Sequence, residues 1–340
     1  MKEINNAYCT LFDSMYADKG IALMQSLRKH NKDSFLYVLC MDDLCYSILS
    51  NESFPNVVIV KLEEFLDEEL ILLKEKRSKG EFCWTCTGKL IKYVLDRFNA
   101  KYCTYIDSDL YFFSNPDILV NEMIDNNCSV QVVPHRFPEK RRWKIIEAQS
   151  GKNCVQFNTF TDEYNSRKLL EKWIGQCIKK CDKYSGGDQM YTSDWGQYTF
   201  VNVSANDGGG LAPWNIEKYR AVRNNNNQII RKSDKKVFDL VFYHFQGLEY
   251  VNRYSVNIHV RNKITVVDQK LLDSLYIQYL THVESIKNKL EEQYGVVPLY
   301  SHSTGLFGEE KNEMTIKKRV SKLLESRNIR KDTYDLRKIL

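Results

Sequence analysis

Short apolar runs alternate with amphipathic stretches along the first part of the chain. The runs are continuous, as expected of strands covered on both faces, and the stretches between them repeat apolar residues at helical spacing. The predicted strands of this part span residues 7–12, 34–41 and 56–60, and the predicted helices span residues 17–30, 42–49 and 62–76. This alternation indicates an α/β fold with a doubly wound, mostly parallel central sheet flanked by helices.

The middle of the chain continues this pattern with less regular connections. Residues 135–150 are basic and aromatic without a clean period, which predicts a mobile loop or a solvated surface. The asparagine-rich residues 223–228 predict a surface hairpin or a disordered tip. The other predicted elements are helices at 87–98, at 115–123 and around Trp173, and strands at 101–106, 128–134, 152–161, 198–203 and 237–245.

The end of the chain differs from the rest. After residue 266 it becomes polar and helical, so we expect a main domain over residues 1–265 and a helical extension over residues 266–340. Residues 315–340 carry nine Lys or Arg against three acids, while the whole chain has a net charge of only +5. The remainder is therefore close to neutral, which argues against nucleic acid as a partner.

The basic segment also has an apolar stripe, which consists of Ile316, Val320, Leu323 and Leu324. Such a helix would suit peripheral contact with an anionic membrane surface. A solvated helix or a frayed chain end is the alternative, and the sequence leaves both open.

The composition is that of a globular protein with a sizeable core. Of the 340 residues, 43% are hydrophobic and 27% are charged. No apolar run is long enough to cross a bilayer and the first residues form no signal peptide, so we expect cytoplasmic residence, with the inner face of the membrane as an extension of it. The ten cysteines should then be reduced and buried, although Cys83 and Cys86 also have the spacing of a zinc knuckle.

Two carboxylates follow the predicted strand that begins at Lys101. Asp107 and Asp109 are one residue apart, so on an extended chain they point the same way. Two bare carboxylates that close together repel, which favours a bound cation or a shared proton. An ordinary Asp-Ser-Asp turn, with Ser108 at its centre, is the alternative.

Several other kinds of site lack their motifs. The chain has neither the phosphate loop Gly-x-x-x-x-Gly-Lys-Ser/Thr nor a Gly-x-Gly-x-x-Gly turn after the first strand, and no His-Glu-x-x-His or Gly-x-Ser-x-Gly motif. The remaining candidate is the pair Asp107 and Asp109 together with His244, at the end of another predicted strand. Two carboxylates and an imidazole suit Mn²⁺ or Mg²⁺, with diphosphate oxygens completing the coordination.

Six sequence pieces in order resemble the GT-A-fold nucleotide-sugar glycosyltransferases. The likeness is to bacterial relatives of family 8, which occur in polysaccharide and lipopolysaccharide gene clusters. The pieces are residues 10–16, 82–93, 105–112, 187–189, 211–215 and 242–247. Together they extend over roughly residues 7–250.

The resemblance implies an enzyme that transfers a hexosyl group from a nucleotide sugar, with a UDP-sugar as the expected donor, to a hydroxyl of a glycan or lipid-linked glycan, with retention of configuration. The metal ligands would be Asp107, Asp109 and His244. The implied donor-binding residues are Thr10, Asp13, Tyr16, Lys89, Ser108 and the two metal-binding aspartates, and the residues implied at the transferred sugar are Asp188 and Gln189. Each has an ordinary structural alternative: a core aromatic for Tyr16, a solvent-facing helix lysine for Lys89 and a helix N-cap for Asp188.

Two positions depart from the family pattern. Cys154-Val155-Gln156 stands where relatives have Asn-x-Gly, and Tyr250 stands where they have a lysine that touches the diphosphate, so Arg253 would have to replace it. These departures keep open a degenerate domain that binds a sugar nucleotide as a scaffold. A phosphatase of the haloacid dehalogenase type is less favoured because several α/β units precede the aspartates, and a pyrophosphorylase because residues 13–16 contain no glycine.

Overall fold

The computed structural model describes residues 4–223, 225–260, 266–298, 300 and 332–339. The chain forms two compact units. Unit 1 contains residues 1–211 and 239–244, and unit 2 contains residues 212–238 and 245–340. The two units divide the chain differently from the expected domains 1–265 and 266–340, which stay a prediction.

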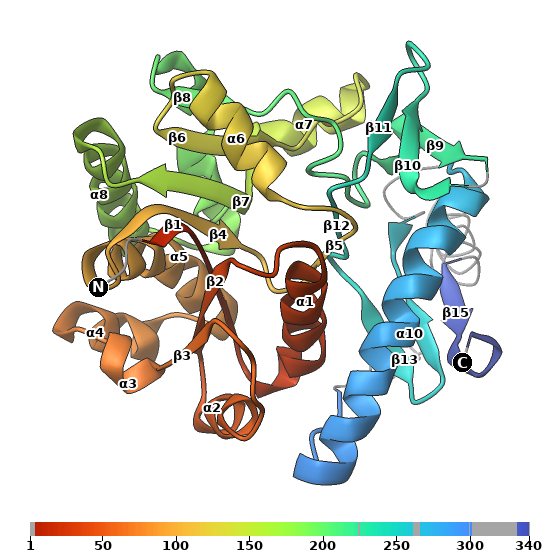
Figure 1. The fold of residues 1–340 in the computed structure, drawn as a ribbon, viewed down its shortest axis with the longest axis horizontal. Helices are drawn as coiled ribbons and strands as arrows, with labels where there is room; N and C mark the ends of the chain where they lie inside the picture. The colour runs from red at the N-terminus through yellow and green to blue at the C-terminus, as the bar shows by residue number, and fades with distance from the viewer. Residues whose placement is uncertain (1–3, 224, 261–265, 299, 301–331, 340) are drawn as a thin grey trace, which may run out of the picture. The chain divides into compact units, whose positions relative to one another are not determined.

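A seven-stranded sheet forms the centre of unit 1 (Figure 1). Its strands, in spatial order, are β3 (Val57–Lys61), β2 (Phe35–Cys40), β1 (Ile4–Phe12), β4 (Ala100–Ile106), β7 (Asn153–Thr161), β6 (Val130–Pro134) and β8 (Val201–Val203). Neighbouring strands are parallel except at β7, which is antiparallel to both β4 and β6. The predicted α/β fold with a mostly parallel central sheet is confirmed.

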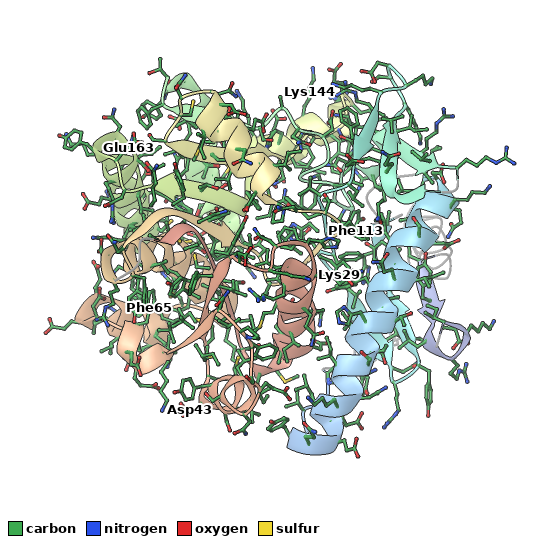
Figure 2. All side chains as sticks on the ribbon, viewed as in Figure 1. Lys29, Asp43, Phe65, Phe113, Lys144 and Glu163 are labelled. Atoms are coloured by element: carbon green, nitrogen blue, oxygen red, sulfur yellow. The ribbon has the colours of Figure 1, made fainter. Side chains whose placement is uncertain are left out.

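Helices cover both faces of this sheet. Because successive residues of β1 point to opposite sides, the side chains of this strand pack against both layers of helices. Cys9 and Leu11 join a core cluster with α5 (Lys79–Arg97) and α8 (Tyr164–Lys179). On the other face the Tyr8 hydroxyl donates to Asp117 at the start of α6 (Asp117–Asp125), at 2.6 Å. Figure 2 shows the side chains that fill the space between the sheet and its helices.

The short helices α1 (Ala17–His30) and α2 (Asp43–Ser50) match their predictions. The predicted helix 62–76 is divided instead into α3 (Leu62–Phe65) and α4 (Glu68–Lys76). The division occurs because Asp67 adopts an extended conformation and caps α4, its carboxylate accepting from the Leu70 backbone N–H at 2.9 Å.

Helix α5 begins eight residues earlier than the predicted residue 87. Ser78 and Glu81 form a capping box, which satisfies the free N–H groups at its start. Cys83 and Cys86 therefore lie on a helix and pack against the core, and the zinc-knuckle interpretation is not supported.

Two further predictions are corrected. The mobile-loop alternative for residues 135–150 is wrong, because they contain the helix α7 (Arg141–Ser150), which a buried Trp143 anchors to the protein; the other residues of α7 are exposed or half-buried, as the solvated-surface alternative predicts. The predicted strand 237–245 is two strands, β11 (Val237–Asp239) and β12 (Phe242–His244), in different sheets. Strand β12 pairs antiparallel with β5 (Leu110–Phe112).

Unit 2 contains two small sheets and a long helix. Strands β9 (Tyr219–Val222) and β10 (Asn225–Arg231) are antiparallel, as the predicted hairpin requires, and β11 follows β10 in that sheet. The second sheet contains β13 (Glu249–Asn252), β14 (Ser255–Asn257) and β15 (Thr333–Asp335), and the helix is α10 (Gln269–Tyr294).

The predicted apolar stripe of the basic segment lies outside the described residues. Among the helices that the structure does describe, none combines the length and the apolar character needed to span a bilayer.

Candidate functional site

The acidic pair lies at the carboxyl end of β4. The Asp107 N–H donates to the backbone carbonyl of Gln156 on β7 at 3.1 Å, which extends the pairing of the two strands by one residue. A tight turn follows, closed by a hydrogen bond from the Leu110 N–H to the Asp107 carbonyl at 3.1 Å. The turn predicted as the alternative is therefore present, and it holds Asp107 and Asp109 partly buried.

His244 reaches the pair through the pairing of β12 with β5. It stands opposite Leu110, the residue directly after Asp109. Its Nε2 lies 2.9 Å from Oδ1 of Asp109 and 3.8 Å from Oδ2 of Asp107. Asp109 and His244 are more than a hundred residues apart in the sequence, and the three-residue antiparallel pairing of β12 with β5 brings them together.

This end of the sheet is the point where the strand order reverses. From β1 the chain proceeds outward through β2 and β3, and then returns to place β4 on the other side of β1. Ligands of open α/β sheets bind beyond the carboxyl ends of the strands at such a reversal. Asp13, after β1, and Asp107, after β4, both follow strands at this position.

The three side chains shift one another's titration. Burial, together with the charge of Asp109, raises the pKa of Asp107 to about 6 although His244 opposes the shift. Burial alone would raise the pKa of Asp109 and lower that of His244. Their mutual attraction and hydrogen bond reverse both effects, so the pKa of Asp109 is lowered and that of His244 is raised well above its usual value.

The geometry fits a divalent cation. One donor atom from each of Asp107, Asp109 and His244 lies within 4.8 Å of the other two, and no other such group of three or more His, Cys, Asp or Glu occurs in the described part of the chain. Two carboxylates and an imidazole are donors that Mn²⁺ and Mg²⁺ accept. The three predicted metal ligands are thus brought together.

Asp188 lies close enough to Asp107 for their charges to interact. Burial, and next the charge of Asp107, raises the pKa of Asp188 to about 8. Its backbone carbonyl accepts from the indole N–H of Trp173 at 3.0 Å. Asp188 precedes the short 3₁₀ turn η3 (Gln189–Thr192), and no side-chain hydrogen bond caps that turn.

Polar side chains lie between Asp188 and the acidic pair. Thr87 on α5 lies close enough to Asp188 and Tyr105 to lower the pKa of each, and Tyr105 has the same effect on Asp107. Gln189 contacts the buried His135 through its side chain. The sequence offered no signal for Thr87 or Tyr105 beyond their place in the matched pieces.

The predicted nucleoside-binding residues follow β1. Asp13 caps the 3₁₀ turn η1 (Ser14–Tyr16), accepting from the Tyr16 N–H at 3.2 Å. The Tyr16 ring is 46% exposed, and partial burial with the charge of Asp109 raises the pKa of Tyr16 to about 12. Tyr16 thus lies beside the acidic pair and is not a core aromatic. Thr10 is fully buried on β1, with no hydrogen-bond partner for its hydroxyl among the described residues.

Two lysines near the site form ion pairs with acidic neighbours. Lys89 pairs with Asp67 at 2.5 Å and Glu69 at 3.4 Å, so it ties α5 to α4, and its contact with a donor phosphate stays a prediction. Lys19 on α1 is buried, pairs with Asp18 at 3.2 Å, and helps to lower the pKa of Asp109. Nothing in the sequence distinguishes Lys19 from an ordinary helix lysine.

Of the remaining predicted positions, Ser108 is half-buried in the turn between the two aspartates. Within the matched piece 211–215, the side chains of Trp214 and Asn215 belong to unit 2 and are buried there, where the Asn215 side chain accepts from the Ala212 N–H at 3.0 Å. Arg253, also in unit 2, pairs with Glu291 on α10 at 3.0 Å.

Comparison with known proteins identifies relatives without a described activity. No family model matches the chain. Two Bacillus subtilis (strain 168) proteins described as uncharacterized, YfnD and YfnF, are each 27% identical to it; the alignments cover 84% and 86% of this chain and 91% and 97% of theirs.

Solved structures with a similar arrangement include two sugar transferases. The galactosyltransferase LgtC, in complex with donor and acceptor sugar analogues, has a TM-score of 0.47 at 13% identity and covers 86% of this chain and 100% of its own. Mouse xyloside xylosyltransferase 1 has a TM-score of 0.44 at 11% identity, and the match covers 72% of this chain and 98% of the transferase chain.

Proposed function

We propose that the protein is a metal-dependent glycosyltransferase of the GT-A kind, which moves a sugar from a nucleotide sugar to an acceptor hydroxyl. The observation that carries the proposal is the convergence of Asp107, Asp109 and His244 at the carboxyl end of a central strand, where the strand order reverses. The six ordered sequence pieces that resemble these enzymes support it independently.

Asp107, Asp109 and His244 would hold Mn²⁺ or Mg²⁺, which supplies Lewis-acid stabilisation for a departing nucleoside diphosphate. Asp13 and the half-exposed Tyr16, next to this centre, are the groups we assign to the nucleoside. A UDP-sugar is the expected donor, on the resemblance to family 8. Thr10, which is buried on β1, and Ser108, in the turn after β4, are the further positions that we assign to the donor.

Asp188 and Gln189 are the groups we assign to the transferred sugar. Because burial is the larger cause of the raised pKa of Asp188, its carboxyl can carry a proton near neutral pH and donate a hydrogen bond to a sugar hydroxyl. A protonated carboxyl is a poor nucleophile. With the retention of configuration that the resemblance to family 8 implies, the assignment therefore favours a route by positioning and electrostatic stabilisation, without a covalent enzyme intermediate.

The acceptor is expected to be a glycan or a lipid-linked glycan, in the synthesis of a bacterial surface polysaccharide or lipopolysaccharide. Cytoplasmic residence, with peripheral membrane contact through residues 315–340, completes this proposal. All of these finer points rest on the sequence resemblance and on the charge of that segment.

The test is a donor-hydrolysis screen of common UDP- and GDP-sugars with Mn²⁺, since such enzymes release the nucleotide slowly without an acceptor. Wild type is compared with Asp109→Asn, which keeps the size of the side chain, and with Asp125→Asn, an exposed aspartate on α6, as matched control. We expect UDP release from one donor. EDTA should abolish it, and Asp109→Asn should reduce it by roughly 10²–10³-fold, the usual loss when one preorganised electrostatic partner is removed.

The Asp125→Asn variant should release UDP at the wild-type rate. Release that survives EDTA and the Asp109→Asn change would remove the metal from the proposal. If no donor is hydrolysed but UDP with Mn²⁺ still raises the melting temperature, the protein is a sugar-nucleotide-binding scaffold.

A further inference from the structure

One glutamine touches two of the three metal-site residues. Gln156 on β7 is fully buried, and its backbone carbonyl accepts the N–H of Asp107 at 3.1 Å. Its side-chain Oε1 lies 2.7 Å from Nδ1 of His244, on the far side of the imidazole from the carboxylates. This residue stands at one of the two departures from the family pattern.

The contact has a chemical consequence for His244. An imidazole binds a metal through a nitrogen that carries no proton, and the group bonded to the other nitrogen decides which one that is. The Nε2 atom faces Asp107 and Asp109, so when these three groups hold a metal the proton of the neutral ring has to be on Nδ1. An amide oxygen accepts that proton and, unlike a carboxylate, adds no third negative charge.

The surroundings hold the amide in place. A Cβ added to Gly210, whose φ is +92°, would lie 2.6 Å from Val133 Cγ1, 2.9 Å from Arg136 Nη1 and 3.4 Å from Gln156 Nε2. The chain at Gly210 therefore passes directly over the amide. The next residue, Leu211, accepts the backbone N–H of His244 at 2.8 Å, so the same segment holds the histidine and its partner together.

We propose that Gln156 is a positioning residue of the metal centre, which holds the His244 ring with its proton on Nδ1 and its Nε2 lone pair toward Asp107 and Asp109. The inference rests on the proposed function, since it assigns a metal to those three residues. It goes beyond that function by giving the sequence departure at this position a defined chemical role.

The first experiment measures Mn²⁺ affinity by electron paramagnetic resonance of the free ion, without any donor sugar. Gln156→Met removes the acceptor at similar volume. Gln131→Met is the matched control: Gln131 is also fully buried, on the neighbouring strand β6, but bonds the Leu119 carbonyl at 2.8 Å instead of a site residue.

We expect Gln156→Met to weaken Mn²⁺ binding by roughly 10- to 100-fold, as loss of such a partner does at other metal sites. Gln131→Met should stay within about twofold of wild type, since it leaves the ligands and their hydrogen bonds intact. Gln156→Glu keeps an oxygen acceptor and should restore tight binding. Equal affinity of Gln156→Met and wild type overturns the inference, whereas wild type that binds no Mn²⁺ overturns the proposed function itself.

The second experiment determines which nitrogen of the His244 ring carries the proton, and it does not depend on a Gln156 variant that folds. The chain has only six histidines, so ¹⁵N-histidine spectra are simple, and the His244→Gln variant identifies the resonances of that ring. With saturating Mg²⁺, Nδ1 of His244 should appear protonated and Nε2 unprotonated in wild type. The opposite pattern would show that Gln156 presents its N–H₂ to the ring and would refute the assigned role.

Discussion

The candidate site concentrates negative charge and compensates it with cations from distant parts of the chain. Three carboxylates interact electrostatically here: the charge of Asp109 acts on Asp107, and the charge of Asp107 acts on Asp188. His244 and the buried Lys19 are the cations whose charges oppose them. A divalent ion bound by the aspartates would take over this compensation from His244, whose Nε2 has to lose its proton before it can bind the ion.

His135 provides a residue-scale prediction on pH. Burial lowers the pKa of His135 to about 4, whereas in the unfolded chain it is about 6.5. Between these values the unfolded state binds more protons, so this contribution to stability is fully present above pH 6.5 and is lost as the pH falls toward 4. The expected loss is about 3 kcal/mol, at ~1.4 kcal/mol per pKa unit.

The measurement is the free energy of unfolding in urea from pH 7 to pH 4.5, for wild type and His135→Gln. The variant lacks the titrating ring, so its curve should be flatter in this interval even if its stability at pH 7 is lower. Two parallel curves would show that His135 does not titrate as its burial implies.

At the scale of single elements, the position where a helix starts and the position of a glycine decide which side chains reach the site. Helix α5 can present Thr87 to Asp188 because the capping box at Ser78 starts it two turns before that residue. Helix α1 lies close against β1, since Gly20 leaves room for the ring of the buried Phe12. That packing places Lys19, the neighbour of Gly20, beside the acidic pair.

Two glycine-to-alanine changes in helices should have opposite effects. In Gly20→Ala the new methyl group would overlap the Phe12 ring, and we expect a loss of roughly 1–3 kcal/mol, as for overpacked cores. In Gly175→Ala on α8 the new methyl group would have no atom of the described residues within 4 Å beyond its own stretch of helix, so the gain in helix propensity should stabilise the protein by up to about 1 kcal/mol.

Chemical denaturation of both variants beside wild type checks these signs. A stabilised Gly20→Ala would mean that α1 can move away from β1 at little cost. In that case the position of Lys19 is not determined by the glycine.

At the scale of the whole molecule, each unit depends on segments distant in the sequence. Unit 1 needs residues 239–244, which return to it after the first stretch of unit 2 and contain His244. Unit 2 includes β15 near the end of the chain, which pairs with β14, and Leu336 just after it is buried. Neither unit corresponds to one continuous stretch that could be cut out.

A chain ending at residue 314 should therefore lose part of unit 2 and keep the metal site. Without β15 the second sheet of this unit loses one strand of three, and we expect a lower unfolding midpoint for the unit. Mn²⁺ affinity should remain near the wild-type value because all three ligands belong to unit 1. Loss of Mn²⁺ binding on truncation would show that unit 1 does not fold without an intact unit 2.

A test of membrane contact has to remove the basic charges while keeping β15. Truncation before Thr315 removes β15 as well as the basic segment, so reduced pelleting with anionic liposomes would be ambiguous. Replacing Lys317, Lys318, Arg319 and Lys322 by glutamine removes charge alone. Peripheral binding predicts a loss of about 1 kcal/mol per basic residue near the surface, and unchanged pelleting contradicts it.

The local pattern of the chain was sufficient to predict the alternation of strands and helices and the strand that ends at Asp107. Hydrophobic period and capping residues act over a few neighbours, and these elements depend on little else. The same locality explains the errors: the break at Asp67 and the helix within residues 135–150 depend on single caps and one buried tryptophan, which periodicity does not weigh.

Sequence and resemblance also predicted which acidic and imidazole groups come together, but only the tertiary structure decided how they are held. Gln156 and His244 are 88 residues apart, and they meet because β7 lies antiparallel beside β4 while β12 pairs with β5. Lys89 forms an ion pair with Asp67, and the charge of Lys19 lowers the pKa of Asp109. Such contacts depend on the packing of distant segments, which no pattern within one segment encodes.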